Sequence, residues 1–345
     1  RGAGPPGPAR KARSVRVKEH TLRGEPAARR LLEEARYEVI PLAGTEEAVE
    51  RWLISRRAEE QKKTTITITA SPTRGIEPTI ALTERLGAKA RRRGGEPSSL
   101  CVVPHLSARL IEDEHHLEEI VARLKEAGVE EVFVIGGDAK EPRGRFHDAL
   151  GLLEALEELG RPFERVGIAG YPEGHPSIER AELERALRKK ALYASYVVSQ
   201  LCFEAKKVLL WARRVRELGV GLPVVVGVAA PIDPKRLAGI AAKIGIGDSA
   251  RFLRKQRAKS LLRLLSPGRR RSALSLVYEP GGFLEELVEE GSREGLLASS
   301  GVTEEGGGMI SGLHLYTFND LQRTLEWVRE EKKMAQREGE KRRRG

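Results

Sequence analysis

Short apolar runs alternate with amphipathic stretches along most of the chain. The runs are rich in β-branched residues and carry little charge, which is typical of strands buried on both faces of a parallel sheet. Eight such runs occur, at residues 36–42, 64–70, 100–107, 131–137, 166–171, 195–203, 223–229 and 313–319. The pattern therefore predicts eight strands separated by helices.

The stretches between the runs show helical spacing. Apolar residues recur at i, i+3, i+4 and i+7 in three clear cases, each closed by a glycine that suits a left-handed cap. These are Leu117, Ile120, Val121 and Leu124 before Gly128; Ala149, Leu153 and Leu156 before Gly160; and Val208, Trp211, Ala212 and Val215 before Gly219. Repeated strand–helix units predict an α/β fold, a (β/α)8 TIM barrel. The alternative is an open doubly wound sheet, in which the fourth strand stays central but different loops face one another.

Three segments depart from this rhythm. Residues 1–30 are rich in Gly, Pro, Arg and Lys and predict a disordered basic leader. We expect residues 31–330 to form the barrel and residues 331–345 to be a basic, disordered tail. More than 80 residues separate the seventh and eighth strands, so we expect an insertion at 245–310. It contains a helix rich in Lys, Arg and Leu that starts near Gly245 and a Pro/Gly/Arg loop at 266–272. A lid, an interface and a tolerated ornament all remain open for it.

The charge lies mainly at the ends. The net charge is +11, of which residues 1–35 contribute +5 and residues 331–345 contribute +4, leaving +2 for the body. Nucleic-acid binding is therefore disfavoured for the barrel, although RNA or an acidic partner at the tails stays an alternative. No apolar run reaches membrane-spanning length and no secretion signal occurs, so we expect a soluble cytoplasmic protein. The two cysteines, Cys101 and Cys202, lie in apolar runs and predict neither disulfides nor a cysteine-based metal site.

Polar residues stand where the predicted strands end. The fourth run closes with Gly136, Gly137 and Asp138, and glycines there allow a tight turn and a close approach. A turn aspartate that caps the next segment is the plain alternative. The full set at the strand ends is Glu38, Thr69, His105, Asp138, Tyr171, Glu173, His175, Gln200 and Asn319. In a barrel these side chains meet in one bowl, where they suit acid–base chemistry on a polar heteroaromatic substrate.

Several other chemistries are excluded or weakened. The chain has no Gly-rich phosphate loop with Lys-Ser/Thr, no HExxH and no tandem CxxC pattern. Gly136 and Gly137 lack the third glycine of a dinucleotide fingerprint. His115 and His116 lie on a charged helix surface and are expected to be solvated, whereas His105 is either a site residue or a structural histidine.

The ordered series of strand-end motifs resembles the methylenetetrahydrofolate reductase family. The resemblance runs over residues 36–327, and its most specific block is Tyr171-Pro172-Glu173-Gly174-His175-Pro176. The other motifs are Tyr37–Pro41, Ile66–Thr69, Pro104–Ser107, Gly136–Asp138, Val198–Gln200, Gly227 with Pro231, and His314–Asn319.

The resemblance implies a barrel flavoprotein that reduces the methylene bridge of methylenetetrahydrofolate to a methyl group. Electrons come from NADH or NADPH through non-covalently bound FAD, and the nicotinamide and the folate use the same face of the flavin in turn. Relatives are often dimers or tetramers, so a homo-oligomer is expected.

The resemblance also assigns residues. Glu38 matches the acid that protonates the bridging nitrogen of the folate, a role for which we expect desolvation to raise its pKa. Asp138 matches a second catalytic residue, which binds the pterin and lies near the flavin, and Gln200 matches a pterin-binding amide. The positions that match the FAD site are Thr69, His105, Ile135, Gly136, Gly137, Ala169, Tyr171, His175 and Lys189, the last placed to neutralise a diphosphate. No metal is expected.

The sequence departs from the family pattern at three places. Gly136 stands where an arginine is usual, Pro234 aligns with a stacking aromatic, and residues 191–194 replace an Asp-Ala-Gly-Ala turn. A flavin-free variant that passes hydride directly, a folate barrel with another one-carbon role, and a non-catalytic folate-binding barrel therefore remain alternatives.

Overall fold

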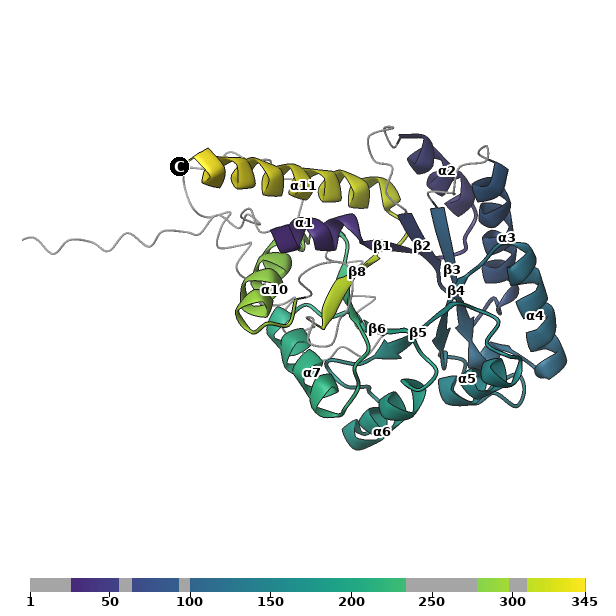
Figure 1. Cartoon of the computed structure of the whole chain (residues 1–345). Helices are drawn as coiled ribbons and strands as arrows, with labels where there is room; N and C mark the ends of the chain where they lie inside the picture. Colours follow the sequence, from purple (N-terminus) through teal and green to yellow (C-terminus); the bar gives the residue numbers. More distant parts are fainter. Residues whose placement is uncertain (1–25, 56–63, 93–99, 234–277, 298–308, 345) are drawn as a thin grey trace, which may run out of the picture.

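The protein is described by a computed structural model, which covers residues 26–55, 64–92, 100–233, 278–297 and 309–344. Eight parallel strands close into a barrel in the order β1 to β8 (Figure 1). Their bounds are β1 Arg36–Val39, β2 Thr64–Ile68, β3 Leu100–Ser107, β4 Glu131–Ile135, β5 Arg165–Gly170, β6 Tyr196–Ser199, β7 Val224–Ala229 and β8 Ile310–Tyr316. The closed order confirms the predicted (β/α)8 barrel, and the open doubly wound sheet is wrong.

Helices cover the outside of the barrel (Figure 1). Their bounds are α1 Pro26–Glu33, α2 Thr45–Ser55, α3 Glu77–Arg92, α4 Glu114–Glu126, α5 Ala149–Glu158, α6 Arg180–Lys190, α7 Ala205–Glu217, α10 Gly281–Arg293 and α11 Leu321–Arg344, with a 3-10 turn η1 at Ala108–Leu110. The three helices with the clearest spacing, α4, α5 and α7, are confirmed. Gly128, Gly160 and Gly219 follow them with φ of 75°, 78° and 77°, the left-handed conformation that ends a helix.

Polar and aromatic side chains fill the barrel interior near the amino ends of the strands. Arg36 at the start of β1 forms an ion pair with Glu131 at the start of β4 and donates a hydrogen bond to the Tyr196 hydroxyl at 3.0 Å. The Arg36 guanidinium carbon also lies 4.3 Å from the centroid of the Tyr196 ring. Above this layer, Val103, Phe133, Val198 and Val225 pack together with Tyr196. The amino end of the barrel is therefore packed, and the site lies at the carboxyl end.

The two basic termini are helical where the structure describes them. Helix α1 begins at Pro26 and buries Ala28, so the predicted disordered leader is wrong for residues 26–30. Helix α11 runs to Arg344 and buries Glu331 and Ala335, so residues 331–344 are helical rather than disordered. An apolar stripe on each helix contacts neighbouring helices, which outweighs the charged composition that suggested disorder.

Strand β8 begins and ends three residues earlier than predicted. It spans Ile310–Tyr316 instead of residues 313–319. Phe318 and Asn319 have φ of 51° and 63°, a conformation that cannot continue a strand. The polar residues that follow Tyr316 therefore belong to a turn.

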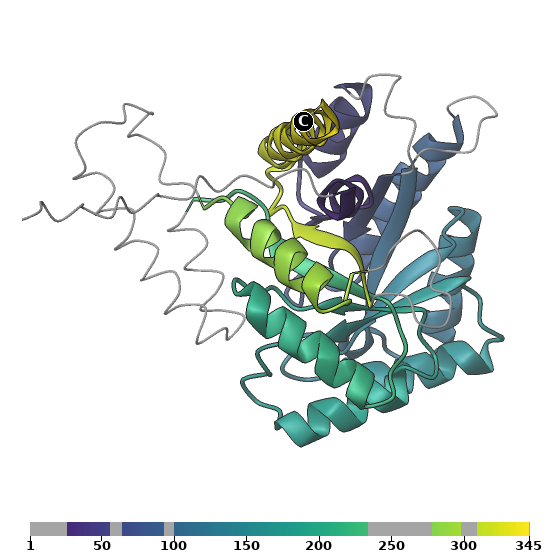
Figure 2. The same cartoon turned by 60° about the vertical axis from the view of Figure 1, so that its left-hand side comes forward.

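Part of the insertion before β8 is ordered as a helix of the barrel. Helix α10 lies beside α7, as Figure 2 shows, and so occupies the helical position between β7 and β8. The helix expected near Gly245, the loop at 266–272 and Pro234 lie outside the described residues. Among the described helices, none combines the length and the apolar character that a bilayer crossing requires.

Candidate active site

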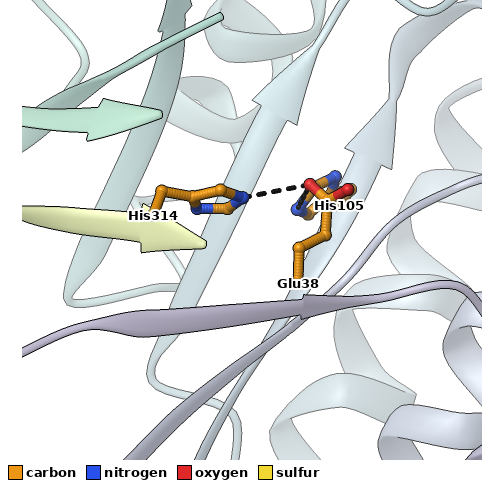
Figure 3. A group of neighbouring side chains, drawn as sticks. All are labelled: Glu38, His105 and His314. Carbon is orange, nitrogen blue, oxygen red and sulfur yellow. Dashed lines mark hydrogen bonds and ion pairs between the residues drawn. The ribbon is translucent and has the colours of Figure 1, made fainter. Parts of the chain in front are cut away.

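Three titratable side chains from three strands meet inside the carboxyl half of the barrel. Figure 3 shows the Glu38 carboxylate of β1 close to the rings of both His105 on β3 and His314 on β8. Strands β1 and β8 are neighbours, with Arg36 opposite His314 and Glu38 opposite Tyr316. Because side chains alternate between the two faces of a strand, Glu38 and His314 both point inward at adjacent heights.

The geometry makes one hydrogen bond and one longer contact. His314 Nε2 lies 3.0 Å from Glu38 Oε2, and His105 Nε2 lies 3.8 Å from the same oxygen. The side chains of His105 and His314 are only 3% and 1% exposed, and that of Glu38 is 16% exposed. Aromatic rings pack against both imidazoles. The Phe133 ring meets the His105 ring edge-on, with 4.7 Å between centroids, and the centroids of Tyr316 and His314 lie 4.8 Å apart. The Glu38 side chain is therefore the most exposed of the three.

The electrostatics contradict one expectation. Burial raises the pKa of Glu38, but the hydrogen bond with His314 and the electrostatic interactions with the His105 and His314 rings together lower it by more, so the net pKa is below the ordinary value. Burial lowers the pKa of His105 to about 4, although the charge of Glu38 opposes this. His105 is therefore neutral at pH 7, and the His314 hydrogen bond is the cause that persists there. The expected raised pKa of Glu38 is wrong because its partner is a histidine.

A second polar group surrounds Gln200 at the end of β6. Gln200 Oε1 accepts a hydrogen bond from Leu201 N at 2.9 Å. The Tyr316 hydroxyl, which has one proton to donate, lies 3.4 Å from Gln200 Oε1 and 3.3 Å from Ser199 O. Within the described part of the chain, no hydrogen bond is made by Gln200 Nε2. A Cβ on Gly227 would lie 2.2 Å from Ser199 O and 2.9 Å from the Tyr316 ring, so only glycine fits beside this pair. The amide is fixed in direction, with its NH₂ group available to a ligand.

Asp138 opens on the same rim. It is exposed and follows Gly137, whose φ of 91° turns the chain after β4. Burial raises the pKa of Tyr171, and the negative charge of Asp138 raises it further. The pKa of Tyr316 is raised by burial and by the charges of Glu38 and Tyr171. Through Tyr171 and Tyr316, these electrostatic interactions connect Asp138 with Glu38, and Tyr316 lies 3.4 Å from Gln200 Oε1.

The residues matched to an FAD site divide into two groups. The inner group includes His105 together with Ile135 and Ala169, which pack against the apolar layer inside the barrel. The outer group follows the strand ends. Thr69 N donates to Val39 O at 3.0 Å, Gly136 O accepts from Arg109 N at 3.0 Å, and the His175 ring meets Tyr171 edge-on at 5.4 Å.

Lys189 is exposed, whereas its neighbour Lys190 is buried. Lys190 Nζ donates to Ala169 O at 3.2 Å and lines a cavity of about 620 Å³ that Tyr171 and helices α6 and α7 also border. Burial lowers the pKa of Lys190 to about 8, against the opposing charge of Asp148. Sequence reasoning missed Lys190, although its place three positions after buried Leu187 indicated an inward face.

Two other residues were missed as parts of the site. His314 stood in a recognised motif but without a role. Arg109 donates from its guanidinium to the carbonyl oxygens of Ala139 and Lys140, both at 2.6 Å, and so holds the loop that carries Asp138. No side-chain pattern could reveal Arg109, because its partners are backbone groups distant in the chain.

Other strand-end candidates serve the scaffold. Glu173 pairs with Lys207 of α7 at 2.7 Å. Asn319 accepts from Ile40 N at 2.7 Å and donates to Ile40 O at 2.9 Å, which ties the end of β8 to β1. The His115 side chain is 80% exposed, as expected.

Comparison with known proteins shows which family this barrel is similar to. The sequence model of the family described as methylenetetrahydrofolate reductase matches residues 45–243. A probable methylenetetrahydrofolate reductase (NADPH) of Caenorhabditis elegans is 32% identical over 121 residues, 33% of this chain and 17% of that protein. Methylenetetrahydrofolate reductase 2 of Saccharomyces cerevisiae is 20% identical over 123 residues, 32% of this chain and 20% of that protein.

The aligned part thus spans a fifth or less of the length of these curated relatives. A crystal structure of oxaloacetate acetylhydrolase aligns with 90% of this chain and 86% of its own, with a TM-score of 0.44 and 10% identity. The family match covers more than half of the chain and most of its strands. The chain therefore belongs to the methylenetetrahydrofolate reductase family.

Proposed function

We propose that the protein is an oxidoreductase that reduces the methylene bridge of methylenetetrahydrofolate to a methyl group, with NADH or NADPH as electron donor and FAD as bound carrier. The observation that carries the proposal is the Glu38–His314 hydrogen bond on the same rim as Gln200 and Asp138. That rim offers a proton path beside two groups suited to a pterin, in a barrel of the matching family.

The residues present fit a flavin. The buried Nε2 of His105 has no hydrogen-bond partner in the described part of the chain, and Tyr171 and His175 offer aromatic surface at the rim. The cavity beside Lys190 is roomy and carries a buried cation, which suits a diphosphate. Thr69, His105, Tyr171, His175 and the Lys189–Lys190 pair would hold the group. When bound, FAD would supply the hydride.

The protein's own groups would orient the folate. The Asp138 carboxylate accepts hydrogen bonds from the N–H groups of a pterin, and Gln200 Nε2 donates to one of its acceptors. Tyr316 lies 3.4 Å from Gln200 Oε1 and interacts electrostatically with Glu38, so a pterin held by Gln200 would bring its methylene bridge near the carboxylate. Binding at both ends of the ring would fix its distance from the acid.

The proton for the reaction would reach the folate through His314 and Glu38. Because the pKa of Glu38 is lowered, the carboxyl group is ionised at neutral pH and holds no proton of its own. We infer that the His314 ring, when it carries a second proton, passes the proton on Nε2 to Glu38 Oε2 and is left as the neutral imidazole. Glu38 passes the proton on to the bridging nitrogen of the folate, so that the five-membered ring opens. Proton transfer by a positioned group of this kind is worth about 10²–10⁴ in rate.

A Glu38→Gln variant tests the function. We expect it to lose folate reduction by about 10²–10⁴-fold, because glutamine cannot carry the proton. Reduction of the bound flavin by NADH or NADPH should continue, since that step needs no acid. Stopped-flow absorption at the flavin band measures the two half-reactions separately. A colourless native protein without NAD(P)H-dependent folate turnover would overturn the proposal.

A second candidate is a barrel that passes hydride directly from the nicotinamide to the folate. It is favoured by Gly136, where the family has an arginine near the flavin. The absorption spectrum of the purified protein separates the two candidates. A protein without flavin bands that still oxidises NADPH only when the folate is added would support direct transfer.

A further inference from the structure

One arginine holds both ends of the loop that carries Asp138. The loop spans residues 136–148, between β4 and α5, and Arg109 lies in the 3-10 turn η1 that follows β3. The Arg109 guanidinium donates from Nε, Nη1 and Nη2 to three backbone carbonyl oxygens of the loop, those of Ala139 at 2.6 Å, His147 at 3.1 Å and Lys140 at 2.6 Å. A single side chain therefore joins the start of the loop to its end.

The backbone around Arg109 contacts the same loop. Arg109 N donates to Gly136 O at 3.0 Å, and Arg109 O accepts from Arg143 N at 3.0 Å. A Cβ on Gly144 would overlap Glu112 O, so the loop also packs closely against the segment that leads into α4. The loop is thus held at its start, its middle and its end by the residues that follow β3.

The Asp138 side chain is not held by contacts of its own. It is exposed, and its carboxylate makes no hydrogen bond within the described part of the chain. Gly137, the residue before it, is fixed by a left-handed turn beside Ser107. Ala139, the residue after it, is fixed by the Arg109 guanidinium. The position of the carboxylate therefore depends on where the loop backbone lies.

We propose that Arg109 is a positioning residue for folate binding, which acts by holding the Asp138 carboxylate where the pterin meets it. This inference rests on the proposed function, in which that carboxylate accepts hydrogen bonds from the pterin. A carboxylate that is already in place does not have to be ordered when the ligand binds, so less of its binding energy is lost. Arginine suits this role because its planar fork reaches several carbonyls at once, whereas lysine has a single ammonium group.

Steady-state kinetics of the full chain with methylenetetrahydrofolate and NADH or NADPH test the role. We expect Arg109→Met to raise the KM for the folate about 10- to 100-fold, the worth of a hydrogen bond to a charged group, and to leave kcat nearly unchanged. Asp138→Ala should raise the KM at least as much. The double variant should be no worse than Asp138→Ala alone, because Arg109 acts through that carboxylate.

The matched control is Arg123→Met on α4. Arg123 also donates from Nε, Nη1 and Nη2, but to Glu77 and Glu84 on the neighbouring helix α3, so the KM for the folate should stay native. Arg109→Lys keeps the charge and one donor group, and should raise the KM by less than Arg109→Met. Circular dichroism checks that each variant is folded.

Hydrogen–deuterium exchange of residues 137–147 tests the support of the loop without folate or cofactor. Exchange should become faster in Arg109→Met and stay native in Arg123→Met. Unchanged exchange, a native KM in folded Arg109→Met, a raised KM in the control, or a further rise when Arg109→Met is added to Asp138→Ala would each overturn the role and leave the proposed function standing. A native protein that neither binds nor reduces the folate would overturn the proposed function, and this role with it.

Discussion

Gly137 shows how one residue positions part of the rim. Its φ of 91° lies in the left-handed region, and a Cβ at this position would come within 1.9 Å of Ser107 Oγ. Two separate demands, on backbone conformation and on space, therefore exclude any other residue. The turn brings Asp138 to the open end of the barrel.

We expect Gly137→Ala to lower the free energy of unfolding by about 2–4 kcal/mol, from backbone strain and the overlap with Ser107 together. The control is Gly160→Ala, because Gly160 has φ of 78° and a Cβ added there would have no neighbour within 4 Å. It should lose only about 1 kcal/mol. Urea denaturation measures both. Equal losses would show that the contact with Ser107 is unimportant.

The sequence could not reveal the protonation state of single residues. The sequence pattern placed Glu38 at a strand end, where burial alone would raise the pKa of its carboxyl group. The decisive partner is His314, which stands 276 positions away in the chain and becomes a neighbour only when β8 closes against β1. Residue type and strand position were predictable, but the hydrogen bond that sets the charge was not.

At the scale of elements, helix α11 buries one acidic side chain, that of Glu331, where it packs on the rest of the protein. Glu331 is 7% exposed, and its Oε2 has no hydrogen-bond partner in the described residues. Burial raises its pKa to about 7; the nearby Trp327 opposes this rise, and the charges of Glu279, Glu330 and Glu285 assist it. The helix is therefore docked best when this carboxyl group is protonated.

The sign of the pH effect follows from linkage. The folded pKa of about 7 lies above the ordinary 4.5, so the stability from this group is complete below pH 4.5 and is lost as pH rises through 7. We expect Glu331→Gln to be more stable than the native protein at pH 8 by on the order of 2 kcal/mol, and to lack this slope. Denaturation curves from pH 5 to 8 measure it. A similar gain in Glu330→Gln, at an exposed position of the same helix, would contradict a specific role for Glu331.

Elements were predictable where period and cap agreed. Helices α4, α5 and α7 had both apolar spacing and a closing glycine, and each appears where expected. Helix α11 was misjudged at its end, because Arg and Lys dominate its composition while Glu331 and Ala335 face inward. Overall charge masked the inward positions on which docking depends.

At the scale of the whole molecule, the barrel is held together across its axis as well as around it. Arg36 of β1 pairs with Glu131 of β4 and bonds to Tyr196 of β6, and Arg165 of β5 lies 3.5 Å from Glu131. Three strands thus share one buried polar layer, and the largely exposed Arg165 of a fourth strand reaches its edge. Eight alternating units predicted the barrel, but cross-axis partners have no signature in local spacing.

We expect Arg36→Met to lower the free energy of unfolding by about 3–5 kcal/mol, because it strips a buried carboxylate of its main partner. The double variant Arg36→Met with Glu131→Leu should recover part of the loss, since no buried charge then remains unpaired. Guanidinium denaturation of the two variants and of Glu131→Leu completes the cycle. Additive losses would contradict a coupled layer.

The backbone N–H of Leu201 decides which end of the Gln200 amide faces a ligand. Because Oε1 accepts from Leu201 N, the NH₂ group of the amide is the part that can donate to a ligand at the open end of the barrel. A heterocycle must therefore present a lone pair at that point, as a ring carbonyl does. A heterocycle with an amino group at that point would place one hydrogen-bond donor against another. The barrel therefore selects its ligands by the direction of their hydrogen bonds, before the reduction step.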